Sequence, residues 1–469
     1  MGSAESNHPS TTRRWGRFLF VVGEHTGHLH AVLGVARRLQ LRGHQVAFLS
    51  AGSPAAIEAA GFSHLPAPWL DSPDEDALFK LPKPARLAEF DHWLSVAEQG
   101  AAAVAATFKP DLLLFQPFQL GVYPFFQRQN LPAVSFSTKP LLSYDPWVPP
   151  YTCGLKPTHD WQGRVRVEWE WWRMRARYLR YRVDCLWQQW RYGISHRSAL
   201  LLAARHTGFC LKQENRTRPL AFDLSFRSVP ELVLHAAEFD FPRARPLPTG
   251  VAYLGPCLDL QRATQAFTPP PGEGPLIYCN LGTVGKQMSP HKLALYQSVL
   301  QAVLAASDWR LVLATGHAEA ALHLKQSRSH WPERIQITEW APQLSAMAQA
   351  HLLINHGGAN STKEALWCGV PLLVLPQYAD QPGMAARIAY HGLGLVADPA
   401  TATATSLHAQ IQQILGQPEF SRQAAHFQRV FRNYEEEGKV ALTLEQYAGL
   451  PSQDRLHDLV PASTQPEYA

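Results

Sequence analysis

The feature that most constrains the fold of this chain is a short apolar run that ends at a pair of glycines. Leu352-Leu353-Ile354 is typical of a buried strand, His356-Gly357-Gly358 of a tight turn, and residues 360–367 of a helix start. Such a turn lets a ligand approach bare backbone, and the free N–H groups of the helix start favour an anion. The segment therefore predicts a diphosphate-binding site, with an ordinary strand-to-helix turn as the alternative.

Strand and helix patterns alternate along the chain in two series. The apolar runs lie at residues 18–22, 45–50, 111–115 and 133–136, and then at 276–278, 310–314, 335–338, 352–354 and 372–375. A stretch rich in proline and glycine, residues 268–275, separates the two series. With 469 residues the chain is long enough for two α/β domains. Each is expected to be a parallel sheet with helices on both faces, and the cleft between them is where such sheets bind ligands.

The predicted boundaries follow from these patterns. They are a disordered N-terminus over 1–14, an N-terminal domain over 15–260, a linker over 261–275, a second domain over 276–418, a helical segment over 419–450 and a loose tail over 451–469. The N-terminal domain carries an insertion, residues 146–197, that holds seven of the 14 tryptophans. Aromatic residues mixed with arginines on helical segments suit a bilayer interface or a wall around a lipophilic ligand. A helical hairpin with solvated arginines is the alternative.

Composition argues against several classes of protein. A charged content of 17% and a net charge of +5 are too mild to indicate a nucleic-acid partner. The six cysteines lie far apart without a CxxC pair, which favours reduced thiols over disulfides or a zinc site. The first 14 residues lack the apolar core of a signal peptide, and no run reaches the ~18 apolar residues that span a bilayer. We therefore expect a cytoplasmic protein, with peripheral membrane contact through the insertion as an added hypothesis.

A longer pattern around the glycine pair resembles the donor-binding signature of the UDP-glycosyltransferase family. The matching residues are Trp340-Ala341-Pro342-Gln343, the run from His356 to Ala365, Gly369-Val370-Pro371, Pro376 and Asp380-Gln381-Pro382. The resemblance implies two Rossmann-like domains facing a central cleft, the GT-B type of fold. It also implies a UDP-sugar as co-substrate, bound mainly by the second domain, with glucose as the expected sugar.

The same resemblance implies a role for each matched residue. Trp340 would stack on the uracil, and the backbone around Ala341 and Gln343 would bond its edge. Glu364 would hold the ribose hydroxyls, because a carboxylate accepts two hydrogen bonds at once. The residues that would bind the diphosphate are His356, Asn360, Ser361, Thr283 and the helix start at Gly358. Asp380 and Gln381 would bind the sugar hydroxyls. No metal or other cofactor is expected, because the helix dipole and His356 face the diphosphate and no Asp-x-Asp pair is positioned to hold an ion.

Near the N-terminus, Gly27-His28-Leu29 resembles the general-base motif of the same family. His28 would take the proton of an acceptor hydroxyl as its oxygen attacks the anomeric carbon, which inverts the configuration. The family orients this base with an aspartate, and Gln116 stands at the matching position. A glutamine can fix the imidazole tautomer but supplies no negative charge, so a carboxylate from elsewhere, such as Glu24, is an alternative.

The hypothesis that follows is a metal-independent, inverting transferase that moves a hexose from a UDP-sugar to a hydroxyl of a lipophilic small molecule. A weaker resemblance to bacterial carotenoid glucosyltransferases, over 232–234, 238–243 and 254–256, points to a long apolar acceptor. Two alternatives remain at this stage. One is a sugar-nucleotide epimerase, and the other is a donor-binding protein with vestigial activity because Gln116 replaces the aspartate.

Overall fold

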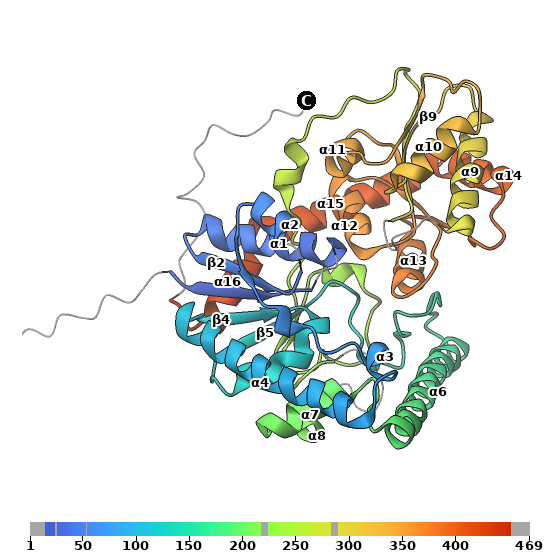
Figure 1. Cartoon of the computed structure of the whole chain (residues 1–469). Coiled ribbons are helices and arrows are strands. Elements are labelled where there is room, and N and C mark those ends of the chain that lie inside the picture. The colour runs from blue at the N-terminus through green and yellow to red at the C-terminus, as the bar shows by residue number, and fades with distance from the viewer. Residues whose placement is uncertain (1–14, 24–25, 53, 217–223, 283–288, 452–469) are drawn as a thin grey trace, which may run out of the picture.

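The computed structural model describes residues 15–23, 26–52, 54–216, 224–282 and 289–451. These residues form two parallel sheets, one above the other in Figure 1, with helices on both faces of each. The strands of the lower sheet lie in the order β3-β2-β1-β4-β5-β6-β7, and those of the upper sheet in the order β10-β9-β8-β11-β12-β13. This arrangement confirms the predicted α/β fold class with two Rossmann-like domains.

The elements of the N-terminal half have the following bounds. The strands are β1 Arg17–Val21, β2 Gln45–Ser50, β3 Ser63–Pro66, β4 Leu112–Phe115, β5 Ala133–Ser137, β6 Glu231–Val233 and β7 Val251–Tyr253. The helices are α1 Thr26–Leu41, α2 Ala55–Ala59, α3 Glu75–Leu78, α4 Lys83–Thr107, α5 Tyr123–Gln127, α6 Trp161–Tyr192, α7 Ser198–Thr207 and α8 Leu211–Glu214. Four short 3-10 turns are η1 Pro68–Leu70, η2 Pro117–Val122, η3 Ala237–Phe239 and η4 Leu260–Thr264.

The elements of the C-terminal half repeat the plan. The strands are β8 Leu276–Asn280, β9 Arg310–Ala314, β10 Ile335–Thr338, β11 Leu352–Asn355, β12 Leu372–Val374 and β13 Gly394–Val396. The helices are α9 Pro290–Leu304, α10 Ala318–Gln326, α11 Gln343–Met347, α12 Ala359–Cys368, α13 Gln381–Tyr390, α14 Ala404–Gly416, α15 Pro418–Glu436 and α16 Lys439–Tyr447. No helix in the described part of the chain is long and apolar enough to cross a membrane.

The continuous apolar runs exist because both faces of each sheet are covered. On β1, Leu19 and Val21 enter the core beneath α4 and α5, while Phe18 and Phe20 enter the core shared with α1. Successive side chains of a strand point to opposite faces, so a strand covered on both sides must be apolar at every position. The central strands of the upper sheet follow the same rule between α9 and α14 on one face and α12 and α15 on the other.

The predicted helical segment over 419–450 is two helices that pack on different domains. Helix α15 packs against α12, and the left-handed Gly438 (φ 58°) then redirects the chain. Helix α16 returns to the N-terminal domain, where it lies beside α1 (Figure 1). Its Glu445 is buried and accepts hydrogen bonds from Arg42 (Nε to Oε1, 2.5 Å) and from His44 (Nε2, 2.8 Å). The chain therefore crosses between the domains twice.

Buried polar contacts also join the two domains. The Arg387 guanidinium on α13 pairs with Asp240 of the N-terminal half (Nη2 to Oδ1, 2.6 Å), and Tyr253 donates its hydroxyl to the same carboxylate. The buried Lys363 on α12 donates to the carbonyls of Leu234 (3.0 Å) and Pro256 (3.1 Å). The position of one sheet relative to the other is thus fixed by hydrogen-bonded charges as well as by apolar packing.

The insertion over 146–197 contains one long helix, so the alternative of a helical hairpin is wrong. Helix α6 runs without interruption for 32 residues, begins at the N-cap Asp160 and ends at Gly193 (φ 77°). Asp160 accepts from the N–H of Gly163, and glycine supplies the left-handed C-cap. In Figure 1 this helix stands at the lower right edge of the molecule, apart from the lower sheet.

Candidate active site

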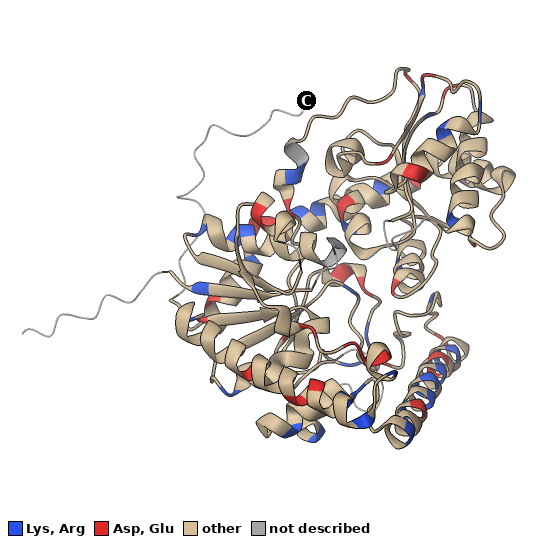
Figure 2. Cartoon of the chain, in the orientation of Figure 1, with Lys and Arg blue, Asp and Glu red and all other residues tan. Residues whose placement is uncertain are grey.

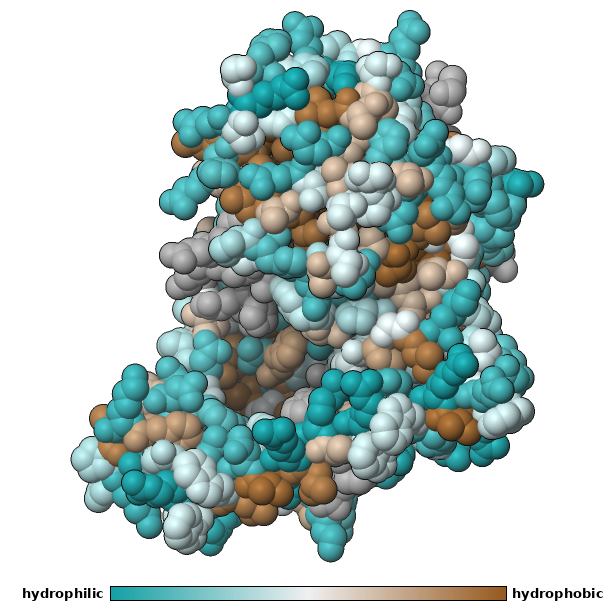
Figure 3. All heavy atoms as spheres, turned by 90° about the vertical axis from the view of Figure 1, so that its right-hand side faces the viewer, coloured by the Kyte–Doolittle hydropathy of each residue, from teal (hydrophilic) through white to brown (hydrophobic). Residues whose placement is uncertain are grey.

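The predicted site residues lie at the switch points of the two sheets. In each sheet the first strand has neighbours whose connections leave in opposite directions: β1 lies between β2 and β4, and β8 lies between β9 and β11. The turns at the carboxyl ends of such strands diverge and leave a crevice. The turns after β8 and β11 meet in the upper sheet, and those after β1 and β4 meet in the lower sheet. Figure 3 shows a hollow between the two halves, with hydrophobic residues on its inner wall.

Glycines on two turns make room for the His356 ring. A Cβ atom on Gly282 would lie 2.7 Å from His356 Cε1, and one on Gly358 would lie 2.5 Å from His356 Nε2. Gly282 and Gly357 also have positive φ angles, +83° and +80°. The strand, turn and helix predicted over 352–367 are present as β11 and α12, and Gly358 is the N-cap of α12. The imidazole therefore lies against the turn at Gly282, at the N-terminus of a helix.

The charge near this turn comes from a residue that sequence reasoning missed. Burial, followed by the neighbouring Lys292, lowers the pKa of His356 to about 4, so its ring is neutral at neutral pH. Lys292 lies in the first turn of α9, and its Nζ donates to the Gly282 carbonyl. Burial lowers the pKa of Lys292 to about 8. His356 can thus offer a hydrogen bond, while Lys292 supplies the positive charge.

A cavity of about 190 Å³ opens beside His356 and Lys292. It is lined by Leu281, Gly282, Ser289, Lys292, His356, Gln377, Tyr378 and Gln381. Gln381 begins α13, and its Oε1 accepts from the N–H groups of Gln377 (2.8 Å) and Tyr378 (3.2 Å). Asp380 precedes it at the N-cap position and is partly exposed. Helix α13 and its N-terminal turn therefore form the wall opposite the β8 turn.

A hydrogen-bonded cluster lies at the other end of this site. Gln343 Nε2 donates to Ser361 Oγ (3.2 Å) and to Glu364, and Gln343 Oε1 accepts from Asn280 (3.2 Å). Ala341 just before it is buried, whereas the Trp340 side chain is 64% exposed. The exposure rules out Trp340 as a core residue and leaves its ring face open to a planar ligand. The structure thus brings Gln343, Ser361 and Glu364 together in one hydrogen-bonded cluster.

An unpredicted arginine reaches this cluster from the predicted linker. Arg262 on η4 pairs with the buried Glu364 (Nη1 to Oε1, 2.7 Å). Each carboxylate oxygen has two lone pairs, so Glu364 can still accept hydrogen bonds from a diol. No sequence pattern indicates this pair, because 102 positions separate the two residues and no motif links them.

The N-terminal part of the predicted site is described only in part. Gln116 is buried at the end of β4, and its Oε1 accepts from the N–H of Gly23 (3.1 Å). Its Nε2 makes no hydrogen bond to the described residues. His28 lies in the first turn of α1, but its side chain falls outside the described residues, and Glu24 does so entirely, as does Thr283 in the C-terminal half. Gln116 therefore contacts Gly23, which lies five positions before His28 in the sequence.

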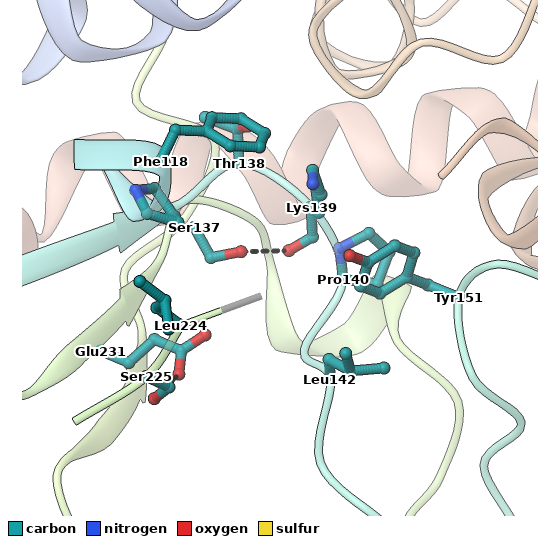
Figure 4. Close-up of a pocket in the computed structure, with 11 residues that line it drawn as sticks. Phe118, Ser137, Thr138, Lys139, Pro140, Leu142, Tyr151, Leu224, Ser225 and Glu231 are labelled. Atoms are coloured by element: carbon teal, nitrogen blue, oxygen red, sulfur yellow. Dashed lines mark hydrogen bonds between the residues drawn. The ribbon is translucent and has the colours of Figure 1, made fainter. Parts of the chain in front are cut away.

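A second, smaller pocket of about 20 Å³ lies in the N-terminal domain at the end of β5 (Figure 4). Among its lining residues, Lys139 Nζ lies 4.8 Å from the centre of the Phe118 ring and 5.6 Å from that of Tyr151. Leu142 and Leu224 add aliphatic surface, and Ser137 donates to the Lys139 carbonyl (3.0 Å). The wall of this pocket is thus mixed, with apolar side chains on one part and Ser137, Thr138, Lys139, Ser225 and Glu231 on the rest. Among the described residues, no three His, Cys, Asp or Glu side chains gather as a metal site.

The two parallel sheets, with the site turns at their switch points, have the arrangement of the two-domain GT-B fold. The chain is similar in structure to the glycosyltransferase of kitacinnamycin (TM-score 0.62, 21% identity, covering 94% of this chain and 100% of that one). It is also similar to CalG4, the calicheamicin glycosyltransferase (TM-score 0.61, 20% identity, covering 93% and 99%).

Comparison of sequences finds relatives that match part of the chain. Residues 302–432 match the family described as Erythromycin biosynthesis protein CIII-like, C-terminal domain. Zeaxanthin glucosyltransferase of Pantoea ananas is 32% identical over 199 residues, 42% of this chain and 44% of that enzyme. NDP-glycosyltransferase YjiC of Bacillus licheniformis is 29% identical over 180 residues, 38% of this chain and 43% of that enzyme. The chain thus spans less than half the length of these relatives, and these matches support its resemblance to the UDP-glycosyltransferase family.

Proposed function

We propose that this protein is an inverting glycosyltransferase that moves a hexose, glucose from UDP-glucose, to a hydroxyl of a lipophilic small molecule. The observation that carries the proposal is the 190 Å³ cavity, which has the His356 turn and Lys292 on one side and the start of α13 on the other. A neutral hydrogen-bond donor, a lysine and a helix N-terminus together suit a diphosphate.

The donor would lie across the C-terminal domain. Trp340 would stack on the uracil and Glu364 would bind the ribose, next to Gln343 and Ser361. The diphosphate would sit between the α12 N-terminus and Lys292, which places the hexose against Asp380 and Gln381. Because Lys292 and the helix dipole supply positive charge to the leaving group, no metal ion is required by this arrangement.

The acceptor would approach from the N-terminal domain. His28 would take the proton of the acceptor hydroxyl as the oxygen forms a bond to the anomeric carbon, and the bond from that carbon to the diphosphate would break. UDP leaves with the electron pair, and the attack from the opposite face inverts the configuration. The apolar side chains of Phe118, Tyr151 and Leu142 at the end of β5 support contact with an apolar acceptor, and the zeaxanthin glucosyltransferase relative favours a long alcohol of carotenoid type.

The affinity of the protein for UDP should depend on pH. Lys292 carries its charge below a pKa of about 8 and loses it above, so the affinity for UDP should fall as the pH rises through 8. Between pH 7 and pH 9 we expect the Kd for UDP to rise about tenfold. Isothermal titration calorimetry at constant ionic strength measures this dependence.

Two variants separate Lys292 from other titrating groups. Lys292→Gln should bind UDP weakly at pH 7 and lose the rise in Kd above pH 8, whereas Lys292→Arg should keep the charge and move the rise beyond pH 9. Lys325, a lysine on α10 outside the cavity lining, provides the matched control as Lys325→Gln, which should behave as the wild type. A wild-type rise in Kd that persists in Lys292→Gln would contradict the role given to Lys292.

The function itself is tested by incubating the protein with UDP-glucose and a panel of hydrophobic alcohols and phenols. Release of UDP together with a product heavier by one hexose supports the proposal. Conversion of the donor without an acceptor would indicate an epimerase instead. Tight donor binding without either reaction would indicate a donor-binding protein, the alternative that Gln116 keeps open.

A further inference from the structure

We propose that helix α6 lies flat in the surface of an anionic lipid bilayer, beside the pocket at Phe118 and Tyr151. Docking to lipid is a property of the helix alone. The idea that the bilayer supplies the acceptor rests on the proposed function.

One face of α6 is already used by the protein. Its buried residues recur at spacings of three and four and include Gly163, Val167, Trp171, Met174 and Cys185. Three of them, Val167, Trp171 and Met174, pack against Leu142, Tyr144 and Leu155. Trp171 is 1% exposed and donates its Nε1 hydrogen to the Val148 carbonyl (2.9 Å). This face holds the helix in place and is unavailable to a partner.

A second apolar stripe runs along the opposite face of the helix. Its exposed members also recur at spacings of three and four: Trp161, Val165, Trp169, Trp172, Leu179, Val183, Leu186, Trp187 and Trp190. At about 100° per residue these positions fall within roughly 100° of arc on the side away from Trp171. Trp169 and Trp172, 56% and 55% exposed, stack on each other with 4.9 Å between their ring centres. A helix with two apolar faces needs two apolar neighbours, and only one of them belongs to the domain beneath it.

Arginines border the exposed stripe on both sides. On the same helical projection Arg164, Arg175 and Arg182 fall on one edge, and Arg173, Arg180 and Arg191 fall on the other. The helix has eight arginines and three acidic residues, a net charge of +5 (Figure 2). Tryptophans between rows of arginine suit the boundary of an anionic bilayer, where the rings enter the acyl region and the guanidinium groups bind lipid phosphates.

The charge decides between lipid and a second copy of the chain. Two α6 helices packed stripe to stripe would bring two rows of arginines against each other, with only three acidic residues on each helix to offset them. Anionic lipid headgroups neutralise the same arginines. The observations therefore favour the bilayer.

Helix α6 lies close to the pocket at Phe118 and Tyr151. Leu142 packs against the buried face of α6 and also lines the pocket, and Tyr151 lines it from the loop that precedes the helix. A lipophilic alcohol that leaves the bilayer at the exposed stripe would then be separated from the pocket only by this layer of side chains.

Co-sedimentation of the full chain with vesicles tests the proposal directly. We expect binding to vesicles of equal parts phosphatidylcholine and phosphatidylglycerol and much weaker binding to phosphatidylcholine alone. Trp169→Ser with Trp172→Ser should weaken the partition about tenfold. Replacing the exposed Arg173, Arg180 and Arg191 with glutamine should weaken binding to the anionic vesicles about a hundredfold.

The controls keep this test independent of catalysis and of folding. Leu322→Ser alters an exposed apolar residue on α10 in the other domain and should leave vesicle binding unchanged. All variants should keep the wild-type melting temperature and transfer rate with a water-soluble acceptor. Equal binding of wild type and stripe variants to both vesicles would overturn the proposal. Self-association that the stripe variants abolish, without vesicle binding, would assign the stripe to a second copy. Intact docking without transferase activity would contradict the proposed function alone.

Discussion

Replacing His28 with alanine is expected to lower kcat by about 10² to 10⁴, the usual contribution of a general base. The Kd for UDP-glucose should change little, because the residues proposed to bind the donor lie in the other domain. Single-turnover assays with UDP-glucose and an acceptor identified in the panel measure the first quantity, and calorimetry measures the second. Unchanged turnover in this variant would show that another group takes the proton.

Gln116 offers a position at the end of β4 where a negative charge can be introduced. Gln116→Glu keeps the length of the side chain and its acceptor for the Gly23 N–H, and it adds a negative charge. Gln116→Asp adds the same charge on a shorter side chain. If Gln116 orients His28, the charge should stabilise the imidazolium and raise kcat in at least one of them. No change in either variant would separate Gln116 from the base.

Replacing Arg387 with alanine is expected to lower the free energy of unfolding by about 3–5 kcal/mol, because Asp240 would remain charged and buried without its partner. Burial alone would raise the pKa of Asp240, but Arg387 and the Tyr253 hydroxyl hold that pKa below its ordinary value. Urea denaturation followed by circular dichroism measures the difference between wild type and variant. The double variant Arg387→Met with Asp240→Asn removes both charges and should recover part of the loss.

The pH dependence of this pair has a definite sign. A carboxyl whose pKa is lower in the folded state contributes stability above its unfolded pKa of ~3.9, and that contribution is lost as the pH falls through the folded value. As the pH falls, the difference in unfolding free energy between wild type and Arg387→Ala should therefore shrink in two steps. It shrinks first through the pKa of Asp240 in the variant, which burial raises once the arginine is gone, and then below about pH 4, where the wild-type contribution is lost. A difference that does not change in acid would mean that the arginine acts by packing alone.

The sequence predicted the parts of the fold that depend on local pattern. Strands covered on both faces are continuous apolar runs, so β1 and β8 through β12 were recognisable. The edge strand β3 reads Ser-His-Leu-Pro, and β13 reads Gly-Leu-Val with a glycine at its start, so neither carries a clear pattern. The turn at Gly357 was also recognisable from local pattern, because a pair of glycines closely follows an apolar run.

The parts that depend on packing between distant segments were not predictable. Lys292 and Arg262 reach the site through the folded arrangement of α9 and η4, and no spacing in the sequence links them to His356 or Glu364. Helix α6 shows the same difficulty in another form. Its two apolar stripes look alike in the sequence, so only the folded domain shows that Trp171 faces inward and Trp172 outward.

The return of α16 to the N-terminal domain has a consequence for biosynthesis. Val440, Ala441 and Leu444 complete the core that covers one face of the first sheet, and Glu445 pairs with Arg42. At ~5–20 residues per second, roughly 10–40 s separate the synthesis of the last strand of that sheet from that of α16. During this interval the α1 face of the sheet is incomplete. Of the two domains described, the one that is synthesised earlier can therefore complete its core only after the other has been made.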